Sequence, residues 1–280
     1  SLVVNLFFTN NISLSYERVL KIFFVIFYIL AFKFLIINYY ENIEKVYKFW
    51  SLIFSVVIFD LIFEFYFGRN ILGYTSIMKG RLASFSGEES VIGHFFFGFC
   101  LIFLSFIYNK TQNIFLNISL AIFLILISLL IGERANFIKT FIAIIIFMFF
   151  VFKINYKIKF LSIILASILI YSSINFSHYY KWRYLKLDKV SMLFSKNGLT
   201  KYLDNSQYGA HRNVAKEIFL DNPIFGVGIK NFRIESANQK YNELDHKLNH
   251  LRVSNHPHDL YYEFLSEKGI AIIPGFQGIS

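Results

Sequence analysis

Six long apolar stretches dominate this sequence, and each approaches the length that a helix needs to cross a bilayer, about 20 residues. Because lipid cannot satisfy backbone hydrogen bonds, a solid apolar run predicts a helix, whereas a membrane β-barrel would show short alternating strands. Short polar or basic segments separate the stretches. The predicted spans cover residues 19–37, 49–67, 91–108, 114–131, 137–152 and 160–174.

The composition agrees with that of a membrane protein. Hydrophobic residues make up 56% of the 280 residues and charged residues 16%, against about 45–50% and about 25% in soluble domains. The single cysteine, Cys100, excludes a disulfide scaffold and a multi-cysteine zinc module. We therefore predict an all-α, polytopic integral membrane protein whose helices form a bundle.

The pattern changes after residue 176. Residues 177–258 hold no spanning run but carry six of the seven histidines, which predicts one large extramembrane loop with short helices. A helix is expected over 211–220, where an apolar stripe ends at Asp221-Asn222-Pro223, and a glycine-containing turn over 223–232. Another helix is expected to start near His258.

These features divide the chain into three predicted regions. Residues 1–176 hold a partial first span and six full spans, and residues 177–258 form the large loop. Residues 259–280 are the start of a truncated further membrane helix. Both ends resemble cuts within a longer protein, since residues 2–8 are too short to span a membrane.

Charge points to an anionic partner but does not orient the chain. The large loop carries 13 lysines and arginines against seven acidic residues, which suits a phosphate or a lipid head group better than a nucleic acid. The short loops on the two predicted sides of the membrane each hold six basic residues. The positive-inside rule is therefore silent.

Charged residues at or within the spans are the first candidates for chemistry, because each is costly there unless it is paired or functional. Asp60 and Glu64 lie one helical turn apart, close to Arg69. Either an ion-paired helix end or a catalytic acid or base explains them. Arg81 and Arg134 lie in short connections on the side of the large loop, which itself carries Arg212. A planar guanidinium suits phosphate binding, although interfacial arginines are also common.

The densest polar cluster runs from His246 to Asp259 and includes His250, His256 and His258. Three explanations remain open: a zinc site, acid–base chemistry by a histidine beside a carboxylate, or a polar loop rich in histidine. The turn at Gly226 and Gly228 is explained either as an anion-holding nest of amides or as a plain turn.

Taken in order, these motifs resemble the O-antigen ligase and O-antigen polymerase family of bacterial envelope enzymes. The likeness runs from about the second full span to the end of the chain, and the last motif fits the ligase signature of His, a small polar residue, nine residues and Gly. Asp259 departs from the Asn, Ser or Gln usual after the histidine. The motifs are GRLASFSG around Arg81, GERANF at Arg134, NPIFGVGIKNF at 222–232 after a helix with Arg212, and HPHDLYYEFLSEKGI at 256–270.

The resemblance implies a glycosyltransferase in the bacterial inner membrane, with the large loop in the periplasm. Its donor would be a polyprenyl-diphosphate-linked glycan, and its acceptor the lipid A core or another glycan, with no metal, nucleotide sugar or nucleic acid. Arg81, Arg134 and Arg212 would clamp the diphosphate. His258 would act as general base with His256 and Asp259 as neighbours. Supporting roles are expected for Gly226, Gly228, Asn231 and Glu64.

Ligase activity is the favoured prediction, with the polymerase of the same family as the alternative. A transporter or flippase for a lipid-linked anion would also need charged residues. Such proteins typically have internal repeats and broken helices, whereas this sequence has no internal repeat and few helix breakers. A zinc-dependent membrane hydrolase using the histidine cluster is the third possibility.

Overall fold

The computed structural model describes residues 2–78, 80–89, 91–111, 113–176, 178–185 and 195–270. Every regular element in these ranges is a helix, which confirms the all-α prediction. The chain divides into two compact units: Leu35–Lys186, here called the bundle, and Ser1–Phe34 with Leu187–Ser280, here called the loop unit. Each is described separately below.

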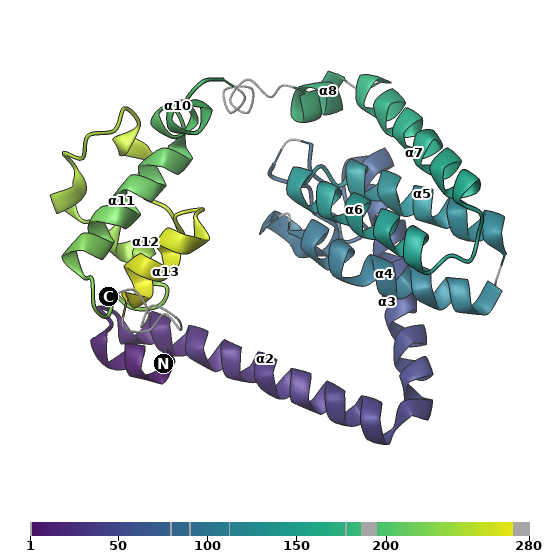
Figure 1. Cartoon of the computed structure of the whole chain (residues 1–280), viewed down its shortest axis with the longest axis horizontal. Helices are drawn as coiled ribbons and strands as arrows, with labels where there is room; N and C mark the ends of the chain where they lie inside the picture. Colours follow the sequence, from purple (N-terminus) through teal and green to yellow (C-terminus); the bar gives the residue numbers. More distant parts are fainter. Residues whose placement is uncertain are drawn as a thin grey trace. The chain divides into compact units, whose positions relative to one another are not determined.

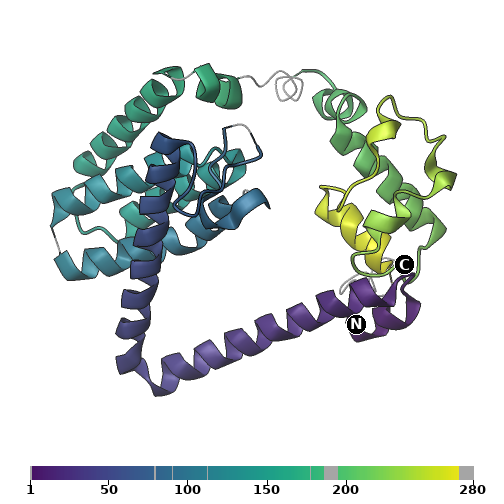
Figure 2. The same cartoon turned by 180° about the vertical axis from the view of Figure 1, so that it is seen from behind.

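The bundle is built from the consecutive helices that the apolar stretches predict. In Figures 1 and 2, α4, α5 and α6 lie side by side, and α3 packs along α4. Their core is fully buried and includes Phe54, Phe96, Leu104, Leu124 and Ile144. The helices are α3 (Tyr40–Phe67), α4 (Ile92–Thr111), α5 (Ile114–Leu130), α6 (Arg134–Phe150), α7 (Tyr156–Phe176) and α8 (His178–Leu185).

All six predicted stretches are helical in the structure. Together with α2 (Ile12–Asn38), which begins in the loop unit, the helices α3, α4 and α7 are long and apolar enough to cross a membrane. Helices α5 and α6 are 17 residues each, at the short end of spanning helices. Within the described residues, four of the six expected spans are thus long and apolar enough to cross a membrane.

The loop unit has a small core around α11, formed by Val214, Ile218, Val227, Phe232 and Tyr241, all almost fully buried. In Figure 1, α12 and α13 lie beside α11. Its elements are α1 (Leu2–Asn5), the 3₁₀ turn η1 (Leu6–Phe8), the start of α2, α10 (Gly198–Asp204), α11 (Gln207–Asp221), α12 (Phe232–Glu235), the 3₁₀ turns η4 (Gln239–Tyr241) and η5 (Asn249–Leu251), and α13 (Leu260–Lys268).

Two helices of the loop unit, α11 and α13, begin at side-chain caps. Helix α11 starts at residue 207, before the predicted 211, because the Ser206 side chain accepts a hydrogen bond from the Gly209 amide. Helix α13 starts as predicted near His258, with Asp259 as its cap. Residues 271–280 of the predicted truncated span lie outside the described residues.

The first residues differ from the predicted tail of a spanning helix. They form a short α-helical turn and a 3₁₀ turn that dock onto residues 225–231. Asn5, fully buried, donates from Nδ2 to Phe225 O (3.0 Å) and accepts at Oδ1 from Ile229 N (3.0 Å). The Phe8 ring stacks on Phe225 at 3.7 Å. Sequence periodicity could not reveal this contact, which joins residues about 220 positions apart.

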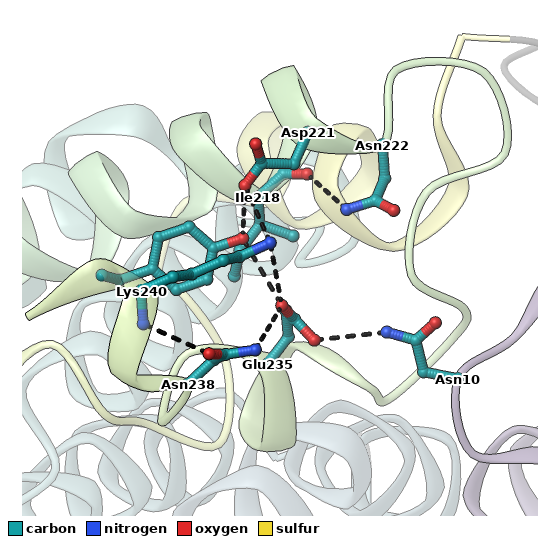
Figure 3. A network of polar contacts seen from close by, with 8 residues as sticks. Asn10, Ile218, Asp221, Asn222, Glu235, Asn238 and Lys240 are labelled. Atoms are coloured by element: carbon teal, nitrogen blue, oxygen red, sulfur yellow. Dashed lines mark hydrogen bonds and ion pairs between the residues drawn. The ribbon is translucent and has the colours of Figure 1, made fainter.

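A polar network ties the end of α11 to α12 and to the N-terminal segment (Figure 3). The Tyr241 hydroxyl donates to Asp221 Oδ2 at 2.7 Å, and Lys240 Nζ lies 3.0 Å from the same oxygen. The bond from Tyr241, followed by that from Lys240, holds the pKa of Asp221 below its ordinary value. Asn10 reaches the network through Glu235. The network thus connects the segment before α2 to α12 and, through it, to α11.

Candidate functional site

Two buried carboxylates at the end of α3 hold the segment that carries Arg81. Glu64 accepts hydrogen bonds from the amides of Ala83 (3.0 Å) and Ser84 (2.6 Å). Asp60 accepts from the Ile71 amide at 2.7 Å and from the Ser84 hydroxyl at 2.5 Å. Among the described residues these carboxylates form no ion pair, so the ion-paired helix end with Arg69 is wrong. Their contacts position the loop between α3 and α4.

Arg81 lies against the short connection between α5 and α6. The next residue, Leu82, donates from its amide to Ile131 O at 3.1 Å. At Gly132, φ is +79° and an added Cβ would come within 1.9 Å of Gly80 O, so the close approach requires glycine. Arg134 is the first residue of α6 and is exposed. Both predicted arginines of the bundle therefore lie at the same end of it.

The Arg81 guanidinium has an unsatisfied donor. Its Nε is buried and finds no hydrogen-bond partner in the part of the chain that the structure describes. A buried donor without a partner costs about 1–3 kcal/mol. An anionic ligand would satisfy this donor.

In the loop unit, α11 and α13 bring Arg212 and Asp259 together. Arg212 Nε lies 3.6 Å from Asp259 Oδ2, and its guanidinium carbon lies 4.9 Å from the centre of the Tyr262 ring. Asp259 also accepts from the amides of Tyr261 (3.1 Å) and Tyr262 (3.3 Å). The carboxylate therefore both caps α13 and orients the guanidinium.

His258 stands directly before this cap in a left-handed backbone conformation, with φ of 56°. Its ring centre lies 4.0 Å from that of His256, 5.1 Å from Tyr208 and 5.3 Å from His211. Burial, followed by the neighbouring His256 and His211, lowers the pKa of His258 to about 4. The imidazole is thus neutral at physiological pH, with a nitrogen lone pair that can accept a proton or a hydrogen bond.

An open cavity in the loop unit is lined by both the predicted general base, His258, and the predicted diphosphate-binding residue, Arg212. Its volume is about 330 Å³, and it is lined by Tyr202, Leu203, Tyr208, Arg212, His258 and Asp259. A second cavity of about 310 Å³ borders Arg212, Lys216 and His246. A cation, a neutral imidazole and aromatic rings around one space can bind an anionic, sugar-bearing ligand. Tyr208 and His211 were not predicted, because their spacing from His258 in sequence carries no signal.

Neither His246 nor His250 lines the cavity that contains His258. His246 Nε2 lies 3.0 Å from Leu203 O, and its Nδ1 accepts a hydrogen bond from the Leu248 amide at 3.1 Å. Both ring nitrogens are therefore hydrogen-bonded to the backbone. His250 is exposed in η5. Within the described ranges, no group of three or more His, Cys, Asp or Glu side chains is arranged to hold a metal ion.

The glycine turn between α11 and α12 supports the site through its backbone. Gly226 and Gly228 have φ of +65° and +98°. The amides of Val227 and Gly228 donate to Ser266 O and Glu267 O on α13, both at 2.9 Å. These amides are occupied within the chain, which favours the plain turn over the anion-holding nest. The Asn231 side chain ties the turn to Ser15 Oγ at 2.9 Å.

The bundle also contains a cavity away from the arginines. It measures about 830 Å³ and lies between the start of α3 and the end of α4, lined by Tyr47, Phe106, Lys110 and others. Arg81 and Arg134 are at the opposite ends of these helices. The cavity is mainly apolar and is not part of the candidate site.

Comparison with known proteins gives one match. The family described as O-antigen ligase matches residues 119–273, which include Arg134, Arg212 and His258. No curated protein and no solved structure matches the chain. The match covers more than half of the 280 residues, and the spanning helices agree with it. The chain is therefore a multi-pass membrane protein of the O-antigen ligase family.

Proposed function

We propose that this protein transfers a glycan from a polyprenyl diphosphate to a sugar hydroxyl of the lipid A core, without a metal ion. Family membership supports the general reaction. The observation that carries the assignment of residues is the 330 Å³ cavity lined by both Arg212 and His258. The reaction would take place on the periplasmic face of the bacterial inner membrane. A polymerase would use the same chemistry with another lipid-linked glycan as acceptor.

The arginines stabilise the leaving group in this proposal. As the bond between the anomeric carbon and the diphosphate oxygen breaks, its electron pair stays on the diphosphate, and guanidinium groups offset the growing negative charge. Arg81, Arg134 and Arg212 are the proposed clamp. The buried, unpartnered Nε of Arg81 supports it, because an anion would complete its hydrogen bonding.

His258 accepts the proton of the attacking hydroxyl while the new bond from its oxygen to the anomeric carbon forms. Its low pKa keeps the ring neutral, with a lone pair that can accept a hydrogen bond from the hydroxyl, but a group with this pKa is a weak base. A bound diphosphate would raise this pKa, since a nearby negative charge favours the imidazolium. Asp259 orients Arg212, and His256 lies beside the base.

The test is expression of the full-length gene in a strain that lacks its own ligase. Wild type should restore attachment of polysaccharide to the lipid A core. His258→Ala should abolish attachment at unchanged protein level, while the matched control His250→Ala should retain it. Arg81→Lys should reduce attachment about tenfold or more, because a single ammonium cannot replace the bidentate fork.

Other outcomes would revise the proposal. Longer polysaccharide chains without attachment to the core would assign the protein as a polymerase. Full attachment by His258→Ala would remove this histidine from the reaction. Wild-type attachment by Arg81→Lys would show that a point charge is enough at this position.

A further inference from the structure

A second histidine with a carboxylate lies at the arginine-bearing end of the bundle. His94 is the third residue of α4, Glu133 directly precedes α6, and Asn136 is its third residue. His94 Nδ1 lies 3.1 Å from Asn136 Nδ2 and 3.6 Å from Glu133 Oε2. Glu133 also accepts from the Gly93 amide at 2.9 Å and from the Asn136 side chain.

The members of this group differ in how far they are buried. Glu133 and Asn136 are 7% and 4% exposed, whereas the His94 side chain is 70% exposed. An added Cβ at Gly93 would lie 2.7 Å from the Glu133 carboxyl carbon, so glycine is required for the carboxylate to approach. Packing of the exposed ring contributes little to the bundle. The buried pair instead holds the imidazole in one orientation.

The partners at Nδ1 determine what the other ring nitrogen can do. The Asn136 amide donates to Nδ1 when the imidazole is neutral, which leaves the proton on Nε2. When the ring is protonated, the Nδ1–H faces the Glu133 carboxylate. In both states Nε2 carries a hydrogen, and among the described residues it has no partner. His94 thus presents a donor away from the bundle in either state.

This donor shares its end of the bundle with the two arginines. The Arg81 segment packs on the Ile131–Gly132 connection, and Glu133 and Arg134 follow directly. We infer that His94 donates a hydrogen bond from Nε2 to a diphosphate oxygen of the lipid-linked donor, next to Arg81 and Arg134. Glu133 and Asn136 are positioning residues. The inference rests on the proposed function and adds His94 to the residues proposed to bind the diphosphate.

Binding of farnesyl diphosphate to the purified full chain in lipid nanodiscs tests this role. His94→Ala should raise the Kd about tenfold, the equivalent of one charge-assisted hydrogen bond. His94→Gln should recover most of the affinity because its side-chain amide also donates. The exposed His178→Ala is the matched control and should leave the Kd unchanged. Glu133→Gln should weaken binding about threefold by loosening the ring.

The variants separate the inference from the proposed function. An unchanged Kd for His94→Ala, with weaker binding by Arg81→Ala, would overturn the role of His94 alone. Unchanged binding by Arg81→Ala and Arg134→Ala would overturn the clamp, whatever His94 does. A His94→Gln variant that unfolds normally but binds no better than His94→Ala would also refute the donor role. Failure of wild type to bind farnesyl diphosphate would refute the anion site.

Discussion

His258 has a left-handed backbone conformation, which is uncommon for residues other than glycine, although histidine, asparagine and aspartate adopt it more often than most. Such conformations persist where surrounding contacts enforce them, often at functional sites. Here the cap at Asp259 and the rings of His256, His211 and Tyr208 surround the residue. The sequence made His258, Asp259 and Arg212 candidates, and the family resemblance gave them their expected roles. Their grouping with Tyr208 and His211 required the fold.

The lowered pKa of His258 gives a direct prediction. Histidine-selective NMR of the protein without substrate should show this ring titrating near pH 4, well below the usual value of about 6.5. Because the charge of His256 lowers this pKa, His256→Ala should shift the midpoint upward. The missing signal in His258→Asn assigns the resonance. A midpoint near 6.5 in wild type would show that the ring is neither desolvated nor close to cationic neighbours.

At the scale of elements, the loop between α3 and α4 depends on the carboxylates of α3. In Glu64→Gln the neutral amide offers one acceptor oxygen in place of two charged ones, so the amides of Ala83 and Ser84 lose binding energy. We expect hydrogen exchange at these amides to accelerate about tenfold, as hydrogen bonds to charged groups are worth about 1.5–3 kcal/mol. The exposed Glu41→Gln is the control. Equal exchange in both variants would contradict the positioning role.

The turn between α11 and α12 makes a second prediction. In Gly226→Ala the new Cβ would lie 2.4 Å from the Glu267 carbonyl carbon and 2.5 Å from Lys268 N, so the turn must separate from α13. Gly73→Ala has a similar positive φ (+86°) with no atom within 4 Å, and serves as the control. We expect thermal unfolding to show that Gly226→Ala costs about 2 kcal/mol more than Gly73→Ala. Equal losses of stability in the two variants would mean that the strain of a positive φ alone accounts for the destabilisation.

For the whole molecule, we propose that each helix from α3 to α7 crosses the membrane, which predicts that the loop from 68 to 90, the α5–α6 connection and the large loop lie on one side of it. Cysteines introduced at exposed Thr75 and His250 should therefore react with an impermeant maleimide added from the periplasm. A cysteine at exposed Asn155 should react only after the membrane is opened. Native Cys100 is buried and should stay silent. Equal labelling at positions 155 and 250 would contradict the proposed topology.

The helical membrane class, the positions of the bundle helices, the presence of α11 and the start of α13 followed from the sequence, because apolar length and caps act over a few neighbouring residues. The contacts of Asn5 with the 225–231 turn, of Glu64 with the Arg81 segment and of Glu133 with His94 depended on the tertiary structure. They join residues 19 to 224 positions apart, and only packing decides which buried acceptor meets which donor.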